Sequence, residues 1–359
     1  MAVINFDERY KAALVQGFEK ASETDSLFAH DLDMEFSGVK TVHVKSLVTE
    51  ALQDYNRALN VGEGSRYGTT KEVGNEEQTF TMTQDKSLSL SVDKGNNKEV
   101  MDKHKVGAIM AAERDEHIIP YMDTYRLKAW AEKAGMVYTV SAAPTADTII
   151  EQIVKARNAQ RNKGVKDNPT LLIPYEYLDA LMLAKQWINL DSLAGKTLPK
   201  GTVGQISGMN VKPISNDRMP AGVFFMIIHP KAVISPVKIK DFKGHVDPPG
   251  LSGDLIEFRM IFDAFVLGKK AAGVLICVLA SNKAAAPTIS NSGAVTTKES
   301  GATTYFTIDG SDPRYSTTAA VYTGNSGAEV GDTIKAYSVI DGKYASDVTE
   351  KMFEGIAGS

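Results

Sequence analysis

Hydrophobic and polar positions alternate most strictly between residues 79 and 92. Leu88, Leu90 and Val92 are separated by serines, which is the two-residue period of a strand with one buried face. Residues 79–84, Thr-Phe-Thr-Met-Thr-Gln, show the same pattern just upstream. We therefore expect two strands that form an extended ribbon projecting from the body. Such a ribbon would need a partner surface, because an isolated two-stranded hairpin is only marginally stable in water.

A long helix is expected after the ribbon. Asn96 with Glu99 three residues later matches a capping box. A helix over residues 97–133 would be roughly 50 Å long at a rise of about 1.5 Å per residue. Pro120 lies inside this segment and lacks a backbone N–H, so it is expected to kink or restart the helix.

The rest of the chain up to residue 283 predicts a mixed α+β body. Residues 1–35 are polar and acidic and are expected to form an arm, with a helical patch near residues 10–18. Helices are expected over residues 147–162 and 176–187. Strands are expected over residues 41–45, 170–174, 203–206, 209–214, 223–228, 232–237, 255–266 and 272–279.

The composition changes at a small-residue linker, Ala284-Ala-Ala-Pro287. Residues 284–359 hold 20 Ser or Thr, and their net charge is −4, which equals the net charge of the whole chain. Short strand patterns separated by turns predict a small all-β sandwich here. The chain therefore reads as a neutral body with an acidic C-terminal domain.

Overall charge and cysteine content exclude several classes of protein. A net charge of −4 over 359 residues gives no basic footprint for nucleic acid or anionic membranes. Cys277 is the only cysteine, so an intrachain disulfide and a cysteine-based zinc site are excluded. It lies in a ten-residue apolar run that is too short to span a bilayer, and the N-terminus lacks a signal-peptide pattern. We expect a cytosol-like compartment and a buried, inert thiol.

No catalytic, cofactor-binding or metal-binding residue is expected. The sequence has no P-loop, no dinucleotide-binding glycine pattern and no nucleophile elbow. Glu113 and His117 share a helical face and could give two metal ligands, but a solvated charge cluster is the favoured interpretation. Asp309-Gly-Ser-Asp312-Pro is interpreted as a tight turn rather than a calcium loop.

Three further features are interpreted structurally. Trp130 and Trp187 are expected in the core. A basic face on the helix over residues 147–162 is expected to be solvated, or to contact another subunit; it comprises Arg157, Arg161, Lys163 and Lys166. The absence of a recognisable catalytic or cofactor-binding motif in the sequence argues against an enzyme.

The succession of elements over residues 1–283 resembles the major capsid proteins of tailed bacteriophages, the Hong Kong 97 type. A Gly-rich loop and ribbon lead into a spine-like helix containing Val106-Gly-Ala-Ile-Met110 and Ile118-Ile-Pro-Tyr-Met-Asp123. A mixed α/β domain containing Gly201-Thr-Val-Gly-Gln-Ile-Ser-Gly208 follows, and residues 257–274 resemble the return to the spine. The order of elements carries this resemblance over most of the chain.

Residues 287–353 resemble the Ig-like domain found at the C-terminal end of chitobiases and β-hexosaminidases, which is also appended to phage structural proteins. Three stretches carry the resemblance: Tyr305-Phe-Thr-Ile-Asp309-Gly-Ser-Asp-Pro313, Tyr322-Thr-Gly324 and Thr333-Ile-Lys-Ala-Tyr337. The resemblance implies a domain on the outside of a particle.

Together the two resemblances imply an α+β subunit with a Hong Kong 97-like capsid fold plus a small all-β Ig-like sandwich. The expected parts are an N-terminal arm (1–35), a shell domain (36–283) and the Ig-like domain (284–359). Within the shell domain we expect an extended loop at about 61–95, the spine helix of a peripheral domain at about 97–133, an axial α/β domain at about 141–245 and return strands at about 250–283.

The implied function is a major capsid protein that self-assembles into hexamers and pentamers of an icosahedral head. The head would enclose double-stranded DNA without sequence-specific contacts. In that family the ribbon lies over a neighbouring subunit, so five residues are expected at an inter-subunit contact: Phe80, Met82, Leu88, Leu90 and Val92.

The implied partners are further copies of the chain, with scaffolding, portal and decoration proteins, and no membrane. Assembly is expected in the host cytoplasm and the final location is the virion. About 35 residues before Gly38 are too few for a cleaved scaffold segment, so a separate scaffolding protein, or none, is expected.

Two alternatives stay open. A tail-tube subunit with an Ig-like domain would form stacked rings, but tube subunits are dominated by β-sheet and the predicted spine helix argues against it. A carbohydrate-active protein with an accessory domain would need a pair of catalytic carboxylates in a cleft. The body shows no such pair in a recognisable setting.

Overall fold

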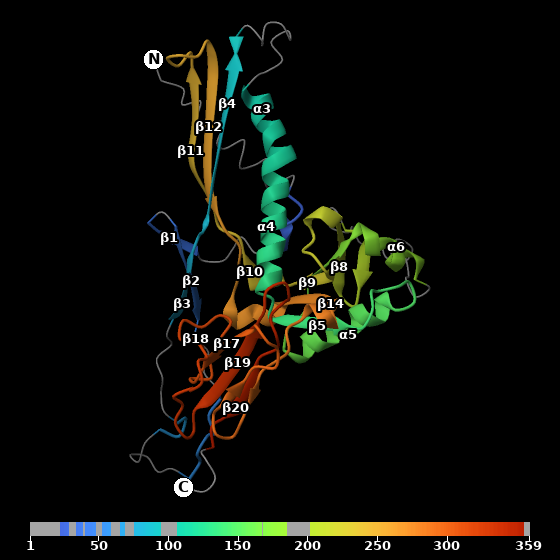
Figure 1. The fold of residues 1–359 in the computed structure, drawn as a ribbon, viewed down its shortest axis with the longest axis vertical. Coiled ribbons are helices and arrows are strands. Elements are labelled where there is room, and N and C mark those ends of the chain that lie inside the picture. The colour runs from blue at the N-terminus through green and yellow to red at the C-terminus, as the bar shows by residue number, and fades with distance from the viewer. Residues whose placement is uncertain are drawn as a thin grey trace. The chain divides into compact units, whose positions relative to one another are not determined.

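The chain divides into two units, and Figure 1 shows its helices and strands. The computed structural model describes residues 22–28, 34–38, 40–47, 52–58, 65–68, 75–94, 106–166, 168–184 and 202–354. One unit is Asp31–Gln84, and the other combines Met1–His30 with Asp85–Ser359. The capping pair Asn96 and Glu99, the helical patch near residues 10–18 and Trp187 lie outside the described residues.

The unit Asp31–Gln84 contains a three-stranded antiparallel sheet. Its strands are β1 (Met34–Ser37), β2 (Thr41–Leu47) and β3 (Asn75–Thr81), in the order β1-β2-β3. Val42 and Val44 are buried and alternate with less buried neighbours, which is the two-residue period expected of a strand with one covered face. The strand predicted over residues 41–45 is confirmed, and β1 was not predicted.

The long helix of the other unit is continuous but contains a π-helical turn. It comprises α3 (Val106–Glu113), the turn η2 (Arg114–Ile118) and α4 (Ile119–Glu132), together roughly 40 Å at about 1.5 Å per residue. The amide N–H of Ile119 bonds to the carbonyl of Arg114, five residues back. Pro120 has no N–H to donate to the carbonyl four residues before it, and in a regular α-helix its ring would clash with that carbonyl. The wider π-helical turn relieves the clash without breaking the helix.

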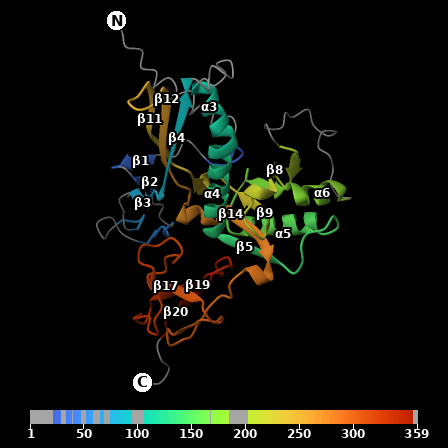
Figure 2. The same cartoon turned by 45° about the horizontal axis from the view of Figure 1, so that its top comes forward.

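A second three-stranded sheet lies beside this helix (Figures 1 and 2). Its order is β11-β12-β4, with strands β11 (Val237–Val246), β12 (Gly253–Phe262) and β4 (Gln84–Asp93). Apolar residues of β12 and the helix form one buried cluster: Met110, Met122, Ile256, Phe258, Met260 and Phe262. A Cβ on Gly253 would collide with the carbonyl of Val92, so the close approach of β12 and β4 requires glycine.

The predicted two-stranded ribbon is wrong in its pairing. Both strand segments exist, but β3 pairs with β2, and β4 pairs with β12. Only Met82 and Thr83 separate β3 from β4, so the chain continues from one sheet into another instead of turning back. A period of two shows that a strand has one buried face, but it does not identify the strand's partner.

A six-stranded mixed sheet forms the largest layer. Its order is β5-β14-β9-β6-β8-β7, and the β5–β14 and β6–β8 pairs are parallel. Its strands are β5 (Met136–Val140), β6 (Thr170–Pro174), β7 (Gly204–Ile206), β8 (Met209–Ile214), β9 (Val223–Ile228) and β14 (Val274–Leu279). A short pair, β10 (Val233–Ile234) and β13 (Phe265–Val266), lies apart from it.

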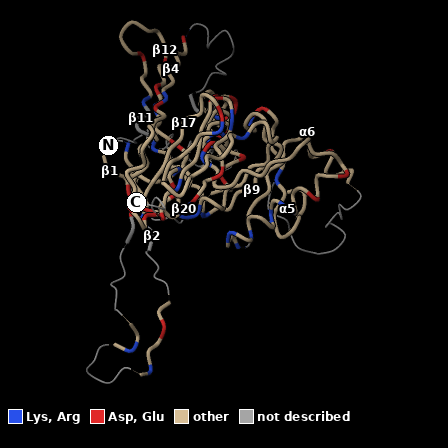
Figure 3. The backbone as a smooth tube through the Cα atoms, turned by 60° about the horizontal axis from the view of Figure 1, so that its bottom comes forward, with Lys and Arg blue, Asp and Glu red and all other residues tan. Residues whose placement is uncertain are grey.

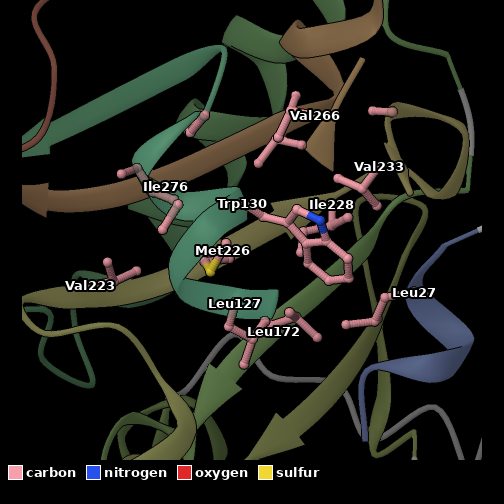
Figure 4. Close-up of a cluster of buried hydrophobic side chains, with 14 of the residues drawn as sticks. Leu27, Leu127, Trp130, Leu172, Val223, Met226, Ile228, Val233, Val266 and Ile276 are labelled. Carbon is pink, nitrogen blue, oxygen red and sulfur yellow. The ribbon is translucent and has the colours of Figure 1, made fainter. Parts of the chain in front are cut away.

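Helices cover both faces of this sheet, so its central strands are apolar on both sides. Met226 and Ile228 of β9 pack with Trp130 of α4 (Figure 4). Phe225 and Ile227 belong to the opposite cluster, with residues of α5 (Ile149–Asn162) and α6 (Tyr175–Leu183). A strand buried on both faces is a continuous apolar run, as β9 is.

Cys277 lies in β14 and is fully buried, as predicted. Burial raises the pKa of its thiol to about 12, because the thiolate would lose its hydration. The thiol therefore stays protonated at pH 8 in the folded chain, whereas an unfolded cysteine with a pKa of about 8.5 is partly ionised.

We expect a thiol-reactive chromogenic reagent at pH 8 to label native protein at a negligible rate, and to label one thiol per chain in denaturant. The single cysteine makes the count unambiguous. Rapid labelling of the native chain would contradict the burial.

The C-terminal residues form two small all-β sheets. One pairs β15 (Thr288–Ile289) with β16 (Val295–Thr296). The other has the order β18-β17-β19-β20, with strands Ala320–Val321, Thr303–Thr307, Thr333–Val339 and Thr349–Met352. Phe306, Ile334 and Ala336 are buried between them, with Ile289 and Val295. An all-β C-terminal region is as predicted.

The structure confirms most of the predicted elements and corrects others. Strands β6, β8 and β9 have the predicted bounds, and α5 begins two residues later than predicted. The expected strand over residues 255–266 is two strands, β12 and β13, separated by Asp263 and Ala264. The expected strand over residues 232–237 is shorter, and β5 and β11 were missed. The helix predicted over residues 176–187 is α6, and its described part ends at Leu183.

Candidate assembly surfaces

The described residues contain no group of three or more His, Cys, Asp or Glu side chains arranged to hold a metal ion. His117 Nε2 lies 4.0 Å from Glu113 Oε2, and the histidine is largely exposed. This geometry is a surface contact between two side chains one helical turn apart. None of the described helices has the length and apolar composition that crossing a bilayer requires.

The Asp309 segment is a turn held by its own side chains. The carboxylate of Asp309 accepts hydrogen bonds from the backbone N–H and the hydroxyl of Ser311, and from the hydroxyl of Thr318 at 2.8 Å. The bond from the Ser311 hydroxyl is the main reason that the pKa of Asp309 is lowered. Its oxygens are therefore engaged within the turn, as the tight-turn interpretation expects.

The predicted basic face on α5 is partly wrong. Arg157 is fully buried, and its guanidinium donates to Gln160 Oε1 at 3.0 Å and to the carbonyl of Lys166 at 3.0 Å. Gln160 in turn donates to the carbonyl of Ala272 at 3.1 Å. Arg161 donates to the carbonyl of Ser207 at 2.7 Å. These two arginines join α5 to neighbouring loops.

A densely hydrogen-bonded polar cluster lies where residues 22–28 meet α4, and we call it the clasp; it comprises Ser22, Thr24, Asp123, Arg126 and Arg218. Asp123 is fully buried. Its carboxylate accepts from Ser22 Oγ at 2.6 Å, Glu23 N–H at 2.9 Å, Thr24 Oγ1 at 2.5 Å and Arg218 Nη1 at 3.0 Å. A buried carboxylate is tolerated only with such compensation.

Arg126, one turn further along α4, provides the second charge of the clasp. Its guanidinium donates to Ser235 Oγ at 2.7 Å and to Thr24 Oγ1 at 3.0 Å. Burial lowers the pKa of Arg126, and the nearby carboxylates of Asp123 and Asp25 act in the opposite direction. An arginine retains its charge in proteins, so the neighbouring carboxylates and hydroxyls must offset its desolvation.

Apolar contacts complete the attachment of residues 22–28. Leu27 is buried in the Trp130 cluster and points toward the indole (Figure 4). The rings of Phe28 and Trp130 meet edge to face at 6.3 Å, and Arg126 lies 5.0 Å from the Phe28 ring centroid. Trp130 is fully buried, as predicted. The clasp therefore fixes residues 22–28, which lie within the expected N-terminal arm, onto the long helix.

The clasp was not predicted from the sequence. Asp123 and Arg126 are charged positions within an apolar stripe of the helix, between Met122 and Leu127. That interruption was the available signal, because a charge on a buried helix face requires partners. Those partners lie about 100 positions away in sequence.

The five predicted ribbon residues are divided between the two units. Phe80 is half-buried in β3 opposite Val42 of β2, and Met82 is fully buried. Leu88, Leu90 and Val92 lie in β4 on one side of the strand, and their burial increases toward Val92. Leu88 packs against the cluster of β12 and the long helix. Their role between subunits remains a prediction.

An open groove runs between β4, β12 and the long helix. Its volume is about 400 Å³, and apolar side chains form its floor, among them Leu88, Phe258 and Met260. The ammonium of Lys86 lies 5.2 Å from the ring centroid of Tyr121 at its rim.

The unit Asp31–Gln84 exposes two tyrosines whose rings are in contact, Tyr55 and Tyr67, which we call the aromatic tip. Tyr67 is 81% exposed and Tyr55 is 48% exposed. Their rings meet edge to face at 5.0 Å, and Asn56 N–H donates to the carbonyl of Arg66 at 3.0 Å. Tyrosine is enriched in protein–protein interfaces, so this exposed pair is a candidate contact surface.

Solved structures are similar to this chain, and one of them has a TM-score above 0.5. The capsid subunit of cyanophage P-SCSP1u matches with a TM-score of 0.52 and 11% identity, over 68% of this chain and 85% of that one. A Mycobacterium phage Che8 structure matches with a TM-score of 0.46 and 18% identity, over 67% of this chain and 85% of that one. A virus-like particle from Pyrococcus furiosus matches with a TM-score of 0.47 and 11% identity, over 76% of this chain and all of that one.

Sequence comparisons add one finding at the C-terminus. The family model described as Fn3 associated matches residues 294–353. A search of curated proteins found no match. The chain thus has the α+β, Hong Kong 97-like fold seen in phage capsid subunits, extended by an all-β domain of the Fn3-associated, Ig-like kind.

Proposed function

We propose that this chain is the major capsid protein of a tailed bacteriophage. Copies of it would form hexamers and pentamers of an icosahedral head around double-stranded DNA, and its role would be structural, not catalytic. The observation that carries the proposal is the fold shared with the cyanophage capsid subunit, matched over 85% of that subunit.

Two surfaces support assembly. A shell subunit must bury apolar area against its neighbours, and specific interfaces bury on the order of 1,600 Å². The aromatic tip and the groove beside β4 both present apolar side chains to solvent in the single chain. We propose that these surfaces, together with β3 and β4, form inter-subunit contacts.

The charge distribution supports a shell that encloses DNA without binding it tightly. Lys and Arg are interspersed with Asp and Glu along the described backbone (Figure 3). The net charge of −4 provides no excess of cations for phosphate neutralisation. We propose DNA enclosure without sequence-specific contact, with scaffolding, portal and decoration proteins as partners, assembly in the host cytoplasm and a final location in the virion.

The domain organisation belongs to the same proposal. The N-terminal arm would be held to the long helix by the clasp, and the long helix would be the spine of the peripheral domain. Strands β6, β7, β8 and β9 of the six-stranded sheet would belong to the axial domain. The residues from 284 onward would form the Ig-like domain on the particle's outer surface. The tail-tube alternative is less favoured because the long helix, not β-sheet alone, organises the described core.

The direct test is electron microscopy of the purified full-length protein, alone and with a co-expressed scaffolding protein. We expect closed shells or separate hexamers and pentamers. A compact monomer under every assembly condition would overturn the proposal, and stacked rings or tubes would favour the tail-tube alternative.

A further inference from the structure

The C-terminal domain is packed on the body, not tethered by a free linker. Ala284, in the predicted linker, is buried, and its N–H donates to the carbonyl of Tyr344 at 2.9 Å. The hydroxyl of Tyr344 donates to the carbonyl of Ala221 at 2.9 Å. The hydroxyl of Tyr315 donates to the carbonyl of Lys133, just after α4, at 2.7 Å. Figures 1 and 2 show the domain beside that end of α4.

The domain lies against an edge of the six-stranded sheet. Among the described strands, β5 is the last of that sheet and pairs with β14 alone. Backbone groups of successive residues in a strand point to opposite sides, so alternate residues of β5 face away from β14. An unpaired row of backbone N–H and C=O groups is a template for another strand.

Two cationic side chains donate hydrogen bonds to the outward-facing carbonyls at the start of this edge. Arg314 Nη1 donates to the carbonyl of Gly135 at 2.9 Å, and Lys283 Nζ donates to the carbonyl of Val137 at 3.0 Å. The two acceptors are two residues apart, as the alternation requires. By the same alternation, Thr139 faces outward next, and its side chain is exposed.

Residues of the C-terminal domain hold both cations in place. Arg314 belongs to this domain and forms an ion pair with Asp312 at 2.7 Å, and Lys283 forms one with Asp347 at 2.6 Å. The side chains of Arg314 and Lys283 are each only 14% exposed. Charged side chains and covering segments are the devices that protect sheet edges from pairing with other chains.

We propose that the C-terminal domain shields the β5 edge of the six-stranded sheet from strand addition by a second copy of this chain. A protein that must contact its own copies at high local concentration gains from blocking this unwanted contact. The proposal concerns the single folded chain, and it holds whether or not the chain forms shells.

The test uses the full-length double variant Lys283→Ala/Arg314→Ala. We expect thioflavin-positive aggregates to form at least about tenfold faster than in the unmodified protein, because the unprotected edge can add strands. The matched control is Lys335→Ala/Lys343→Ala, which removes the same charge from ion pairs with Glu350 and Glu299, neither of which is a residue of β5. The control is expected to behave like the unmodified protein.

A third substitution separates edge pairing from simple exposure of apolar surface. Thr139→Pro removes an outward N–H, and it should restore slow aggregation when added to the double variant. Circular dichroism of Thr139→Pro alone checks folding, and Thr139→Lys replaces it if the proline variant does not fold. The proposal is overturned if the double variant aggregates no faster than the control, or if the blocking substitution at Thr139 leaves its aggregation unchanged.

Discussion

Replacing Asp123 with alanine is expected to lower the free energy of unfolding of the unassembled subunit by about 3–5 kcal/mol. The buried Asp123 carboxylate accepts four hydrogen bonds, two of them from Ser22 and Thr24. Its removal leaves Arg126 buried, with Asp25 at 3.7 Å as the nearest remaining carboxylate. Urea denaturation of the two proteins measures the difference.

The matched control for Asp123→Ala is Glu132→Ala on the same helix. Glu132 lies 3.9 Å from Lys128, and both side chains are largely exposed. Its loss should change the free energy of unfolding by less than about 0.5 kcal/mol. A similar small effect for Asp123→Ala would show that the clasp contributes little, and our account of residues 22–28 would then fail.

The clasp also predicts a local effect. Asp123→Asn keeps an acceptor oxygen but loses the charge, so it should destabilise less than alanine does. Limited proteolysis should detect faster cleavage near residues 22–28 in both variants, because Asp123 accepts hydrogen bonds from both Ser22 and Thr24 of this segment.

The double substitution Tyr55→Ser/Tyr67→Ser is expected to reduce shell formation at a fixed protein concentration by at least about tenfold. A loss of about 1.4 kcal/mol of binding free energy per inter-subunit contact lowers the affinity tenfold. Truncation of an aromatic residue at the centre of an interface commonly costs more than that. The subunit itself should keep its melting temperature, because both side chains are largely exposed in the single chain. Light scattering and electron microscopy measure assembly, and calorimetry measures stability.

Val330→Ser is the control for the aromatic tip. Val330 is 71% exposed in the C-terminal domain, so it removes exposed apolar area without touching the tip. We expect normal shells from it. Normal shells from the tyrosine double variant as well would show that the aromatic tip is not an assembly contact, even if the capsid proposal itself is correct.

The sequence pattern predicted most accurately the elements that are buried along their whole length. Strand β9 was predicted with correct bounds because it is wholly apolar and lies between Gly222 and His229. Strand β11 was missed because its register shifts between Ile239 and Asp241. A shift of this kind interrupts the two-residue period on which strand prediction depends.

Long-range pairing was the part that sequence could not provide. The alternation at Leu88, Leu90 and Val92 correctly indicated a strand, but its partner β12 begins at Gly253, far along the chain. The contacts of the clasp are also long-range, since Asp123 and Ser22 are 101 positions apart in the sequence. The docking of the C-terminal domain through Arg314 likewise depends on contacts 179 positions away.

The π-helical turn before Pro120 has a consequence for the rotational phase of the long helix. Successive residues of a regular helix advance by about 100°, so Met110 and Met122 would lie about 120° apart around a regular axis. The extra residue of the π turn removes roughly one residue of rotation, about 100°, and brings the two side chains nearly into line. Both are indeed buried in the same cluster against β12. The proline thus sets the angular alignment of the helix segment that precedes it, and a regular helix would turn Met110 away from the sheet.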